Sequence, residues 1–343
     1  MRNKIKLSIC IGTFNRVEFI GETLDSIFSQ NSKFIEIILV DGGSTDGTEV
    51  LVNSYLKKYK NLRYIKLPSK GGFDEDYTLA VSKAKGDFCW LFSDDDIIKP
   101  GAIKYILRNL NSELDSLIIN AEIRDSALYA VLKNRCMNLN KNKVFNSDQF
   151  QQFFVATAAH SSYVGSVVIK RSIWNSRDKK KYFGTLFVHV GVLFQSPFPK
   201  KTLVIAKPLV SIRYGNAMWT VRSFEISLFV WPKLIWGLKC FSDDAKNKII
   251  SSDPWKSIIR LLYYRARGSY SIDQYNIFLV KRLDIFMRIF AYFVAISPGK
   301  FLNLIFSIYF YLFRFLHKNS RLILIDLEKS DYHCGIIFSN KLI

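Results

Sequence analysis

Short apolar runs rich in β-branched residues alternate with amphipathic stretches from residue 5 to residue 125, and this alternation constrains the fold most strongly. Such runs predict buried strands, and the stretches between them predict helices that cover a sheet. The predicted strands are Lys6–Ile11, Glu36–Val40, Leu62–Lys66, Phe88–Phe92 and Leu117–Ala121. The predicted helices are Glu18–Gln30, Asp46–Tyr59, Asp74–Ala84 and Gly101–Asn111. The pattern therefore predicts an α/β fold with an open mixed, mainly parallel sheet and helices on both faces.

The pattern becomes less regular after Leu128 and turns wholly helical after Tyr214. In the middle stretch we expect helices at Asp148–Ala158 and Leu186–Phe194, and strands at Val164–Lys170 and Leu203–Arg213. Later helices, rich in aromatic and basic residues, are expected at Phe224–Lys239, Ile249–Arg267, Tyr275–Ala295 and Phe301–His317. The chain is thus predicted to hold an α/β domain at residues 1–215 and a helical region at residues 216–343.

Four polar loops follow predicted strands or lie at the same edge of the predicted sheet. They are Thr13–Asn15, Asp41–Gly43, Lys70–Gly72 and Asp94–Asp96. Ligands of open α/β sheets bind outside the carboxyl ends of the strands. We therefore expect these loops to form one binding site.

Three consecutive carboxylates, Asp94, Asp95 and Asp96, come after the apolar run Phe88–Phe92. Because like charges repel, this crowding favours a compensating cation. Alternate residues of an extended segment share a face, which would let Asp94 and Asp96 bind one hard divalent ion such as Mg²⁺ or Mn²⁺. That ion could in turn hold a diphosphate. The alternative is a solvated turn before a helix that starts near Pro100.

The segment Leu7–Arg16, the loop Val40–Thr48 and the acidic run Asp94–Asp96 occur in this order and at this spacing, and together they resemble the family 2 glycosyltransferases of the GT-A fold. The resemblance covers residues 5 to 125 well and residues 160 to 216 more loosely. It implies that the first loop and the Asp after the second strand hold the nucleotide, and that the acidic run binds the metal and the sugar diphosphate. The nucleotide-sugar residues that it implies are Thr13, Asn15, Arg16, Asp41, Asp94, Asp95 and Arg213, and the metal ligands are Asp94 and Asp96.

Several of these residues also have structural interpretations. Thr13 could hydrogen-bond a base or ribose, or cap the helix that follows. Asp41 could accept a proton from a pyrimidine, or simply form a turn. Lys70 lies beside two glycines that permit close contact with phosphates, or it is a solvated surface residue. Arg213 matches a position where relatives place an arginine that would stabilise the departing diphosphate.

The helix that follows Gly72 begins with several acidic residues. Asp46 and Asp74 are predicted to cap their own helices, whereas Asp76 could reach the donor sugar or ribose. Many relatives carry Asn or Arg where this sequence has Asp74 and Asp76, so no family role is carried over to these two residues. The stretches Gly71–Tyr77 and Tyr182–Gly191 look most like the O-antigen enzymes that transfer 3,6-dideoxyhexoses such as abequose, which implies a CDP-sugar donor.

The catalytic base that the resemblance leads us to expect is missing. Inverting members carry an acidic residue at the start of the helix after the acceptor loop, where it deprotonates the attacking hydroxyl. The equivalent stretch Phe187–Leu193 holds no acid, and His189 is the candidate base because imidazole accepts a proton near neutral pH. His189 could also contact metal or phosphate, or be a buried structural histidine. In a retaining mechanism the leaving diphosphate itself would assist the acceptor hydroxyl, so no protein base would be needed. If a protein base is used, His160 is the second candidate after His189.

The net charge of +20, from 49 basic and 29 acidic residues, favours a polyanionic partner. Neither Ile289–Ile296 nor Phe301–Phe313 provides the roughly 20 apolar residues that span a bilayer. We expect interfacial helices on an anionic membrane surface, and the alternatives are an ordinary helical domain or a re-entrant hairpin around Pro298–Gly299. The basic residues expected near lipid are Lys281, Arg282, Arg288, Lys300, Arg314, Lys318 and Arg321.

The cysteines and the N-terminus bear on location. Cys10, Cys89, Cys136, Cys240 and Cys334 are scattered without metal-ligand spacing, which indicates reduced thiols. Met1–Lys4 runs into a strand without a small-residue cleavage site, so no secretory signal is expected. We expect a peripheral (monotopic) protein on the cytoplasmic face of the bacterial inner membrane. Its expected acceptor is a polyprenyl-diphosphate-linked glycan of O-antigen or another surface polysaccharide.

Three other classes of protein fit the sequence less well. A processive polysaccharide synthase of the same fold usually carries several spans and a Gln-x-x-Arg-Trp segment, which this sequence lacks. A nucleic-acid-binding protein would interleave basic and aromatic residues across a sheet or groove, so no nucleic-acid partner is expected. The presence of Asp41, Asp94 and Asp96 argues against an inactive scaffold. The sequence therefore predicts a metal-dependent glycosyltransferase.

Overall fold

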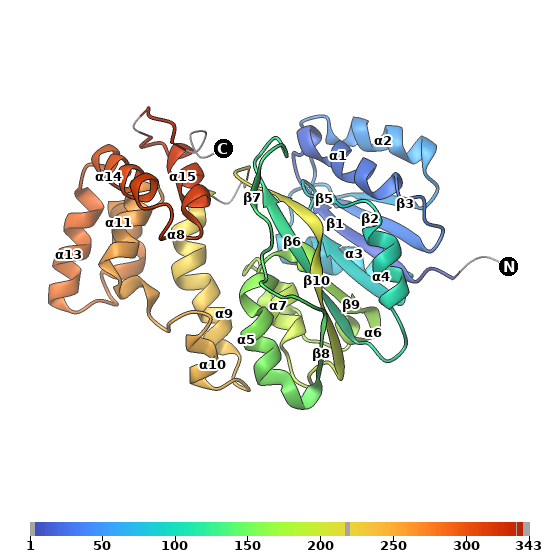
Figure 1. The fold of residues 1–343 in the computed structure, drawn as a ribbon. Coiled ribbons are helices and arrows are strands. Elements are labelled where there is room, and N and C mark those ends of the chain that lie inside the picture. The colour runs from blue at the N-terminus through green and yellow to red at the C-terminus, as the bar shows by residue number, and fades with distance from the viewer. Residues whose placement is uncertain (1–3, 217–219, 334, 339–343) are drawn as a thin grey trace. The chain divides into compact units, whose positions relative to one another are not determined.

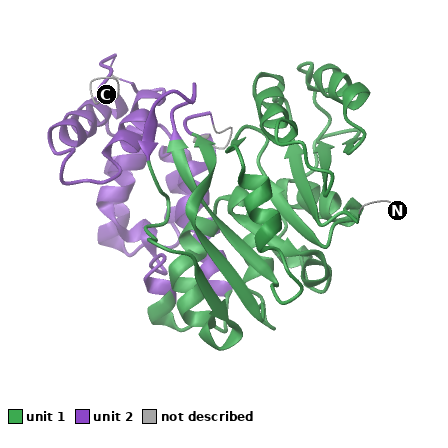
Figure 2. Cartoon of the chain, turned by 45° about the vertical axis from the view of Figure 1, so that its right-hand side comes forward, with its two compact units in different colours: residues 1–123, 134–213, 238–245 green, residues 124–133, 214–237, 246–343 purple. Residues whose placement is uncertain are grey.

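The computed structural model describes residues 4–216, 220–333 and 335–338 (Figure 1). The predicted features at Met1–Asn3 and Cys334 lie outside these residues. Figure 2 shows that the chain divides into two compact units. The first unit comprises residues 1–123, 134–213 and 238–245, and the second comprises residues 124–133, 214–237 and 246–343. The prediction that residue 215 separates a catalytic region from a membrane-associating region is not tested by this division, and it stays a prediction.

The first unit is built on a mixed sheet whose strand order is β3-β2-β1-β4-β9-β6-β10-β5, with β8 paired to β10. Strands β3, β2, β1 and β4 are parallel to one another, whereas β9 runs antiparallel to β4 and β6. The strands are β1 (Leu7–Thr13), β2 (Ile35–Asp41), β3 (Leu62–Lys66), β4 (Phe88–Phe92), β5 (Ile97–Ile98), β6 (Ser116–Arg124), β8 (Lys143–Asn146), β9 (Val167–Lys170) and β10 (Lys201–Arg213).

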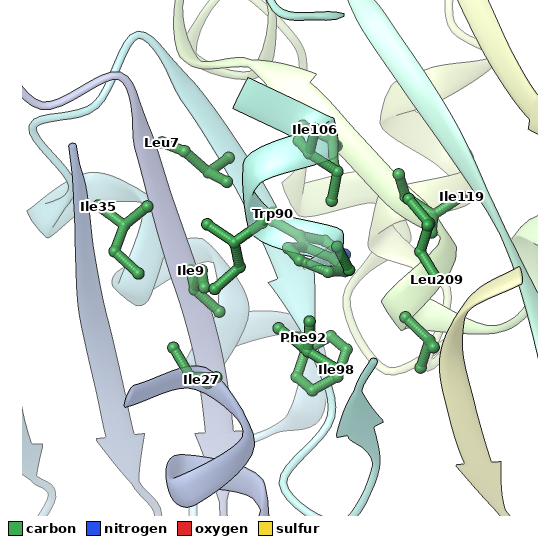
Figure 3. Packing of buried hydrophobic residues seen from close by; sticks show 14 of the residues in the cluster. Leu7, Ile9, Ile27, Ile35, Trp90, Phe92, Ile98, Ile106, Ile119 and Leu209 are labelled. Atoms are coloured by element: carbon green, nitrogen blue, oxygen red, sulfur yellow. The ribbon is translucent and has the colours of Figure 1, made fainter. Parts of the chain in front are cut away.

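Helices cover both faces of this sheet, as predicted. The helices are α1 (Val17–Phe28), α2 (Thr48–Lys58), α3 (Phe73–Lys83), α4 (Ala102–Asn109), α5 (Phe150–Ser161), α6 (Arg171–Asn175) and α7 (Val188–Leu193). Strand residues such as Ile9 and Trp90 pack with α1, α2 and α4 in one buried cluster (Figure 3). Because side chains alternate along a strand, Gly12 faces the other side, where it adjoins Asp76 and Tyr77 of α3.

Most predicted elements are confirmed, with shifts at their ends. The prediction of one helix at Tyr275–Ala295 is wrong, because a turn at residues 280–284 separates a π-helical turn at Tyr275–Leu279 from a helix at Ile285–Ile296. Of the helix predicted at Ile249–Arg267, only Ile258–Ala266 is α-helical. Leu62–Lys66 and Phe88–Phe92 form strands over the predicted residues, whereas only the second half of Val164–Lys170 is a strand, because a 3₁₀ turn occupies Val164–Ser166. The short strands β5 and β8 were not predicted, since two to four residues carry too little periodicity. Cys10 and Cys89 are buried free thiols on β1 and β4, as expected.

The second unit is helical. A core of aromatic and aliphatic side chains, including Phe224, Leu261, Tyr270 and Val294, holds its helices together. Its elements are β7 (Val131–Lys133), α8 (Ser223–Glu225), a π-helical turn (Ile226–Val230), α9 (Trp231–Gly237), α11 (Ile258–Ala266), α12 (Ile272–Gln274), a second π-helical turn (Tyr275–Leu279), α13 (Ile285–Ile296), α14 (Gly299–Leu312) and α15 (Ser320–Glu328). Helix α10 (Asp243–Asn247) lies at the boundary between the units.

Helices α13 and α14 are bent by 94° at Ser297–Pro298. No single helix in the described residues is long and apolar enough to cross a membrane, and only this bent pair passes a test of length and composition together. The expectation that neither arm is long enough alone is confirmed.

Asn303 of α14 is fully buried, and its side-chain amide donates to the carbonyls of Ala266 in α11 at 3.0 Å and Leu327 in α15 at 2.9 Å. One polar side chain therefore connects three helices of the second unit.

Replacing Asn303 by alanine should destabilise the second unit. The substitution leaves two buried carbonyls without this donor, which costs about 2–3 kcal/mol. Urea unfolding followed by circular dichroism measures the loss, and Asn319→Ala, at an exposed position at the start of α15, is the matched control. Equal unfolding midpoints for the two variants would contradict the bridging role of Asn303.

Candidate functional site

The ends of β1 and β2 bring Thr13 and Asp41 together. These residues are register partners in the parallel pair, and the Gly42 amide donates to the Thr13 carbonyl at 2.9 Å. Asp41 is fully buried, and one carboxylate oxygen accepts from the Ser44 amide at 2.8 Å and the Ser44 hydroxyl at 2.7 Å. The other oxygen accepts from the Tyr64 hydroxyl at 2.5 Å. Asp41 therefore forms the turn and also holds a fixed carboxylate at the sheet edge.

Asn15 ties the first loop to the second. Its amide donates to the Ser44 hydroxyl at 2.8 Å, and its side-chain oxygen accepts from the Thr45 amide at 2.8 Å. Asn15 has a left-handed backbone with φ +52°, which asparagine tolerates better than most residues. The first two loops are thus one hydrogen-bonded unit.

Asp46 caps a helix start, as predicted. One oxygen accepts from the Thr48 amide at 3.0 Å at the start of α2, and the other accepts from the Val17 amide at 3.0 Å at the start of α1. The side chain therefore serves two helices, and this accounts for its place in the loop without a ligand.

Asp76 lies among the loops at the ends of β1 and β2. A Cβ placed on Gly71 would lie 2.9 Å from an Asp76 oxygen, so the absence of a side chain there makes room for this carboxylate. Burial, assisted by neighbouring carboxylates, raises the pKa of Asp76 to about 6, although Lys70 opposes the shift. The Lys70 ammonium is exposed and lies 4.4 Å from the centre of the Phe14 ring. Lys70 and Asp76 therefore lie beside the first loop.

Arg16 faces the first two carboxylates of the acidic run. Its guanidinium lies 3.7 Å from an Asp94 oxygen and 3.6 Å from an Asp95 oxygen, and all three side chains are mostly buried. The Thr13 hydroxyl also lies close enough to Asp94 to lower its pKa, although it makes no hydrogen bond of good geometry among the described residues. The first loop and the acidic run are therefore in direct contact.

Asp96 is buried and held by three donors. One oxygen accepts from the Arg213 amide at 2.7 Å, and the other accepts from the Tyr163 hydroxyl at 2.7 Å and from the Ser93 hydroxyl. Burial raises the pKa of Tyr163, and the charge of Asp96 raises it further, so this hydroxyl stays a donor. The carboxylate of Asp96 is therefore fixed by the nearby Ser93 and by two donors far away in the sequence, the Tyr163 hydroxyl and the Arg213 backbone amide.

Arg213 joins the same cluster through its side chain. Its Nε donates to the Asp95 carbonyl at 2.9 Å, and its terminal nitrogen pairs with Glu22. The guanidinium carbons of Arg213 and Arg16 lie 5.1 Å and 5.4 Å from the centre of the Phe19 ring. Two cationic groups thus lie beside the acidic run, where a diphosphate would need them.

The donor chemistry of the acidic run fits a hard divalent ion. Burial raises the pKa values of both Asp94 and Asp96, and the charge of Asp95 raises them further, which marks an excess of negative charge that a cation would relieve. No group of three or more His, Cys, Asp and Glu side chains in the described residues is arranged around a metal position. Carboxylate oxygens are the ligands that Mg²⁺ and Mn²⁺ prefer, so the chemistry of Asp94 and Asp96 fits such an ion.

His189 lies on α7. Only 1% of the residue is exposed, and it sits between the rings of Phe73 and Phe187 at 6.4 Å and 6.3 Å. Among the described residues neither ring nitrogen has a hydrogen bond of good geometry. Burial lowers the pKa of His189 to about 4, although the nearby carbonyls of Ser161 and Ser162 oppose the shift. His189 is therefore a neutral imidazole near neutral pH.

His160 has a different environment. One ring nitrogen lies 2.8 Å from the Ile119 carbonyl of β6, and the ring is partly buried beside Tyr163. The second base candidate thus contacts the sheet.

The prediction that Asp74 caps its own helix is wrong. Asp74 is the second residue of α3, and its oxygens accept from the Leu186 and Val188 amides, each at 2.9 Å. Burial raises the pKa of Asp74 to about 6, although these two amides oppose the shift. The carboxylate therefore serves the start of α7, because tertiary contacts decide which free amides it meets.

Several residues that contact the predicted site residues were not predicted from the sequence. Tyr64, Tyr163, Ser93, Ser44, Phe19 and Glu22 all contact predicted site residues. Tyr163 lies three residues after the candidate base His160, and Ser93 directly precedes the acidic run, so both lie close to predicted site residues in the sequence. Tyr64 has no local signal, because it meets Asp41 only through the pairing of β2 and β3.

Comparison with known proteins supports this geometry. Residues 8–172 match the family model Glycosyl transferase family 2. The abequosyltransferase RfbV of Salmonella typhimurium is 29% identical over 61% of this chain and 67% of its own length. The GalNAc(5)-diNAcBac-PP-undecaprenol beta-1,3-glucosyltransferase of Campylobacter jejuni is 26% identical over 54% of this chain and 59% of its own length.

Solved structures share the fold. TarS 1-349 of S. aureus has a TM-score of 0.54 at 14% identity and covers 94% of this chain and 91% of its own. The mannosyltransferase PcManGT of Pyrobaculum calidifontis, solved with GDP-Man and Mn2+, has a TM-score of 0.51 at 12% identity and covers 95% of this chain and 87% of its own. This chain therefore carries a family 2 glycosyltransferase domain with a GT-A fold.

Proposed function

We propose that this protein transfers a sugar from a nucleotide donor to a polyprenyl-diphosphate-linked glycan in the synthesis of O-antigen or a related bacterial surface polysaccharide. The observation that carries this proposal is the contact between the first loop and the acidic run, where Arg16 faces Asp94 and Asp95. It brings together the side chains to which we assign the nucleotide and the diphosphate. The similarity to an abequosyltransferase and to an undecaprenol-linked glucosyltransferase supports the pathway.

The nucleotide would bind at the ends of β1 and β2. The Asp41 carboxylate is held there by Ser44 and Tyr64 and keeps lone pairs for a base or ribose. Thr13 and Asn15 line the same edge, and Lys70 and Asp76 lie beside them. A CDP-sugar is the favoured donor because of the similarity to the abequosyltransferase, whereas TarS 1-349 was solved with UDP-GlcNAc.

The sugar diphosphate would bind at the acidic run. Asp94 and Asp96 would hold Mg²⁺ or Mn²⁺, and Asp95 would contact the donor. The bound metal would supply positive charge to the diphosphate as the sugar leaves. Arg16 and Arg213 stack on Phe19 and would share that role, because cations there stabilise the developing negative charge.

His189 is the proposed base for the acceptor hydroxyl. Its low pKa keeps the imidazole neutral, which is the form that accepts a proton. In this structure the ring is buried, so the acceptor would need to reach it through movement of nearby side chains. If the leaving diphosphate assists the hydroxyl instead, His189 would orient the substrate.

We also propose that the second unit binds the cytoplasmic face of the inner membrane as a peripheral protein. Helix α14 is reversed relative to an ordinary soluble helix, because Asn303 and Ser307 are buried while Phe301 and Leu312 are about 60% exposed. Helix α13 likewise exposes a row of apolar residues. The exposed large apolar and aromatic residues on the two helices are Ile285, Phe286, Ile289, Phe290, Tyr292, Phe293, Ile296, Phe301, Ile305, Ile308, Tyr309 and Leu312.

Charge favours lipid as the partner of this apolar face. Six Lys and Arg residues and one Asp lie between Lys281 and Lys318. Basic residues beside an apolar aromatic face suit an anionic leaflet, where each contributes about 1 kcal/mol near the surface. A lipid-linked acceptor would be held in the same membrane.

Asp94→Asn should weaken metal-dependent donor binding. The variant keeps the side-chain size but loses a carboxylate, so the affinity for CDP in the presence of Mn²⁺ should fall by about tenfold or more. Isothermal titration calorimetry with CDP and with UDP measures this. Asp87→Asn, at a half-exposed position paired with Lys4, is the control. Unchanged nucleotide affinity in Asp94→Asn would sink the metal assignment.

His189→Gln should lower kcat by about 100-fold or more while leaving donor affinity unchanged, because it removes a proton acceptor from the reacting side only. Steady-state kinetics and calorimetry separate the two effects. A loss confined to donor binding would reassign His189 to the donor site.

The same variant reports on the burial of His189. The unfolded chain takes up a proton near pH 6.5 and the folded chain near pH 4, so protonation favours unfolding in between. Wild type should therefore lose stability relative to His189→Gln as the pH falls from about 6.5 towards 4. Urea unfolding at several pH values tests this, and a constant difference between the two proteins would contradict it.

Phe286→Glu combined with Phe293→Glu should release the protein from vesicles. Losing two buried aromatic side chains costs about 3 kcal/mol or more, so binding to phosphatidylglycerol vesicles should fall by about 100-fold. Val50→Glu, at an exposed position on α2 in the first unit, is the control. Flotation assays measure the bound fraction, and persistent binding of the double variant would move the contact elsewhere.

A further inference from the structure

We infer that Asp74 is a positioning residue that couples the donor loops to α7 through the first turn of α3. The inference rests on the proposed function, because it assigns α7 to the acceptor side. Asp74 has no exposed surface, and its two oxygens accept from amides more than 110 positions later in the chain. The Leu186 amide belongs to the loop that leads into α7, and the Val188 amide belongs to the first residue of α7.

The loop held by Asp74 has an unfavourable backbone. Leu186 adopts φ +68°, a left-handed conformation that is unfavourable for a non-glycine residue. The Thr185 hydroxyl accepts from the Phe187 amide at 3.0 Å, and Gly184 supplies a second positive φ. The Asp74 carboxylate accepts from the strained residue itself, so it contributes to holding this conformation.

The same turn of α3 contacts the donor side. Asp76, two residues further on, lies against Gly42 and Gly71, since a Cβ on these glycines would lie 3.7 Å and 2.9 Å from its oxygens. The hydroxyl of Tyr77 donates to the Phe92 carbonyl at 2.8 Å, at the end of the strand that precedes the acidic run. Asp74, Asp76 and Tyr77, all near the start of α3, therefore meet the start of α7, the donor loops and β4.

Helix α7 is also fixed on a second side. A Cβ on Gly191 would lie 2.5 Å from the Tyr182 ring, so α7 packs directly on this ring and only glycine fits. Two contacts therefore hold α7: the Tyr182 ring packs against Gly191, and the Asp74 carboxylate accepts from the amides of Leu186 and Val188. A shift of the α3 turn when the donor binds would be passed to the helix that carries His189.

Asp74→Asn tests this coupling. Asparagine keeps the size but has one acceptor oxygen, so it retains at most one of the two amides. The ratio kcat/KM for the acceptor should fall by about tenfold or more, whereas calorimetric affinity for CDP or UDP with Mn²⁺ should stay within about twofold. Equal losses of nucleotide affinity and turnover would overturn the assignment, as would unchanged kinetics.

Asp115→Asn controls for the loss of a buried carboxylate that accepts from a distant backbone amide. Asp115 directly precedes β6 and is 6% exposed. Its carboxylate accepts from the Lys200 amide at 2.8 Å. This variant should lose stability without a change in kcat/KM for the acceptor. If it reproduces the kinetics of Asp74→Asn, the effect of Asp74 is only structural and the inference fails. Gly191→Ala, which pushes α7 from its other side, should share the kinetic signature of Asp74→Asn.

Hydrogen exchange separates failure of this inference from failure of the proposed function. Adding CDP or UDP with Mn²⁺ should protect the amides of residues 182–191 in the wild type and not in Asp74→Asn. Protection without any sugar transfer would overturn the proposed function and keep the coupling. Transfer without a difference in protection between the two proteins would overturn the coupling and keep the function.

Discussion

The crowding of buried carboxylates at the carboxyl ends of β1, β2 and β4 is the constraint on which the rest of the site depends. Parallel register makes Thr13 and Asp41 neighbours, and the end of β4 leads into the acidic run. Each carboxylate then needs a partner: Tyr64 and Ser44 for Asp41, Arg16 for Asp94, and Tyr163 for Asp96. These partners fix the loops, and this would preorganise the site for the diphosphate of the proposed donor.

Local patterns in the sequence predicted the strand-end loops well but could not supply their partners. Apolar runs such as Phe88–Phe92 have a clear period and clear ends, so the edge that carries Asp94 followed directly. Asp74 looked like a cap because it stands at the start of a helix, yet its amides come from Leu186 and Val188. Contacts of this kind depend on tertiary packing, and a single sequence holds no trace of them.

Asn303 shows how one residue can support two different arguments. In the sequence it is a polar residue within the otherwise mostly apolar stretch Phe301–Phe313, which is too short to span a bilayer. In the structure its amide binds the carbonyls of α11 and α15, so the polar side of α14 faces inward. The apolar side then has to face out, and this is the physical basis for expecting lipid there. The buried polar face of α14 and its exposed apolar face are two consequences of the same packing.

Sugar transfer in the presence and absence of a divalent ion tests the central claim most directly. Purified protein would be incubated with membranes that hold the lipid-linked acceptor and with labelled CDP- and UDP-sugars, first with Mn²⁺ and then after chelation with EDTA. The account predicts transfer from one of these donors that stops on chelation and returns when Mn²⁺ is restored. Transfer that continues unchanged in EDTA would contradict a site built around the carboxylates of Asp94 and Asp96.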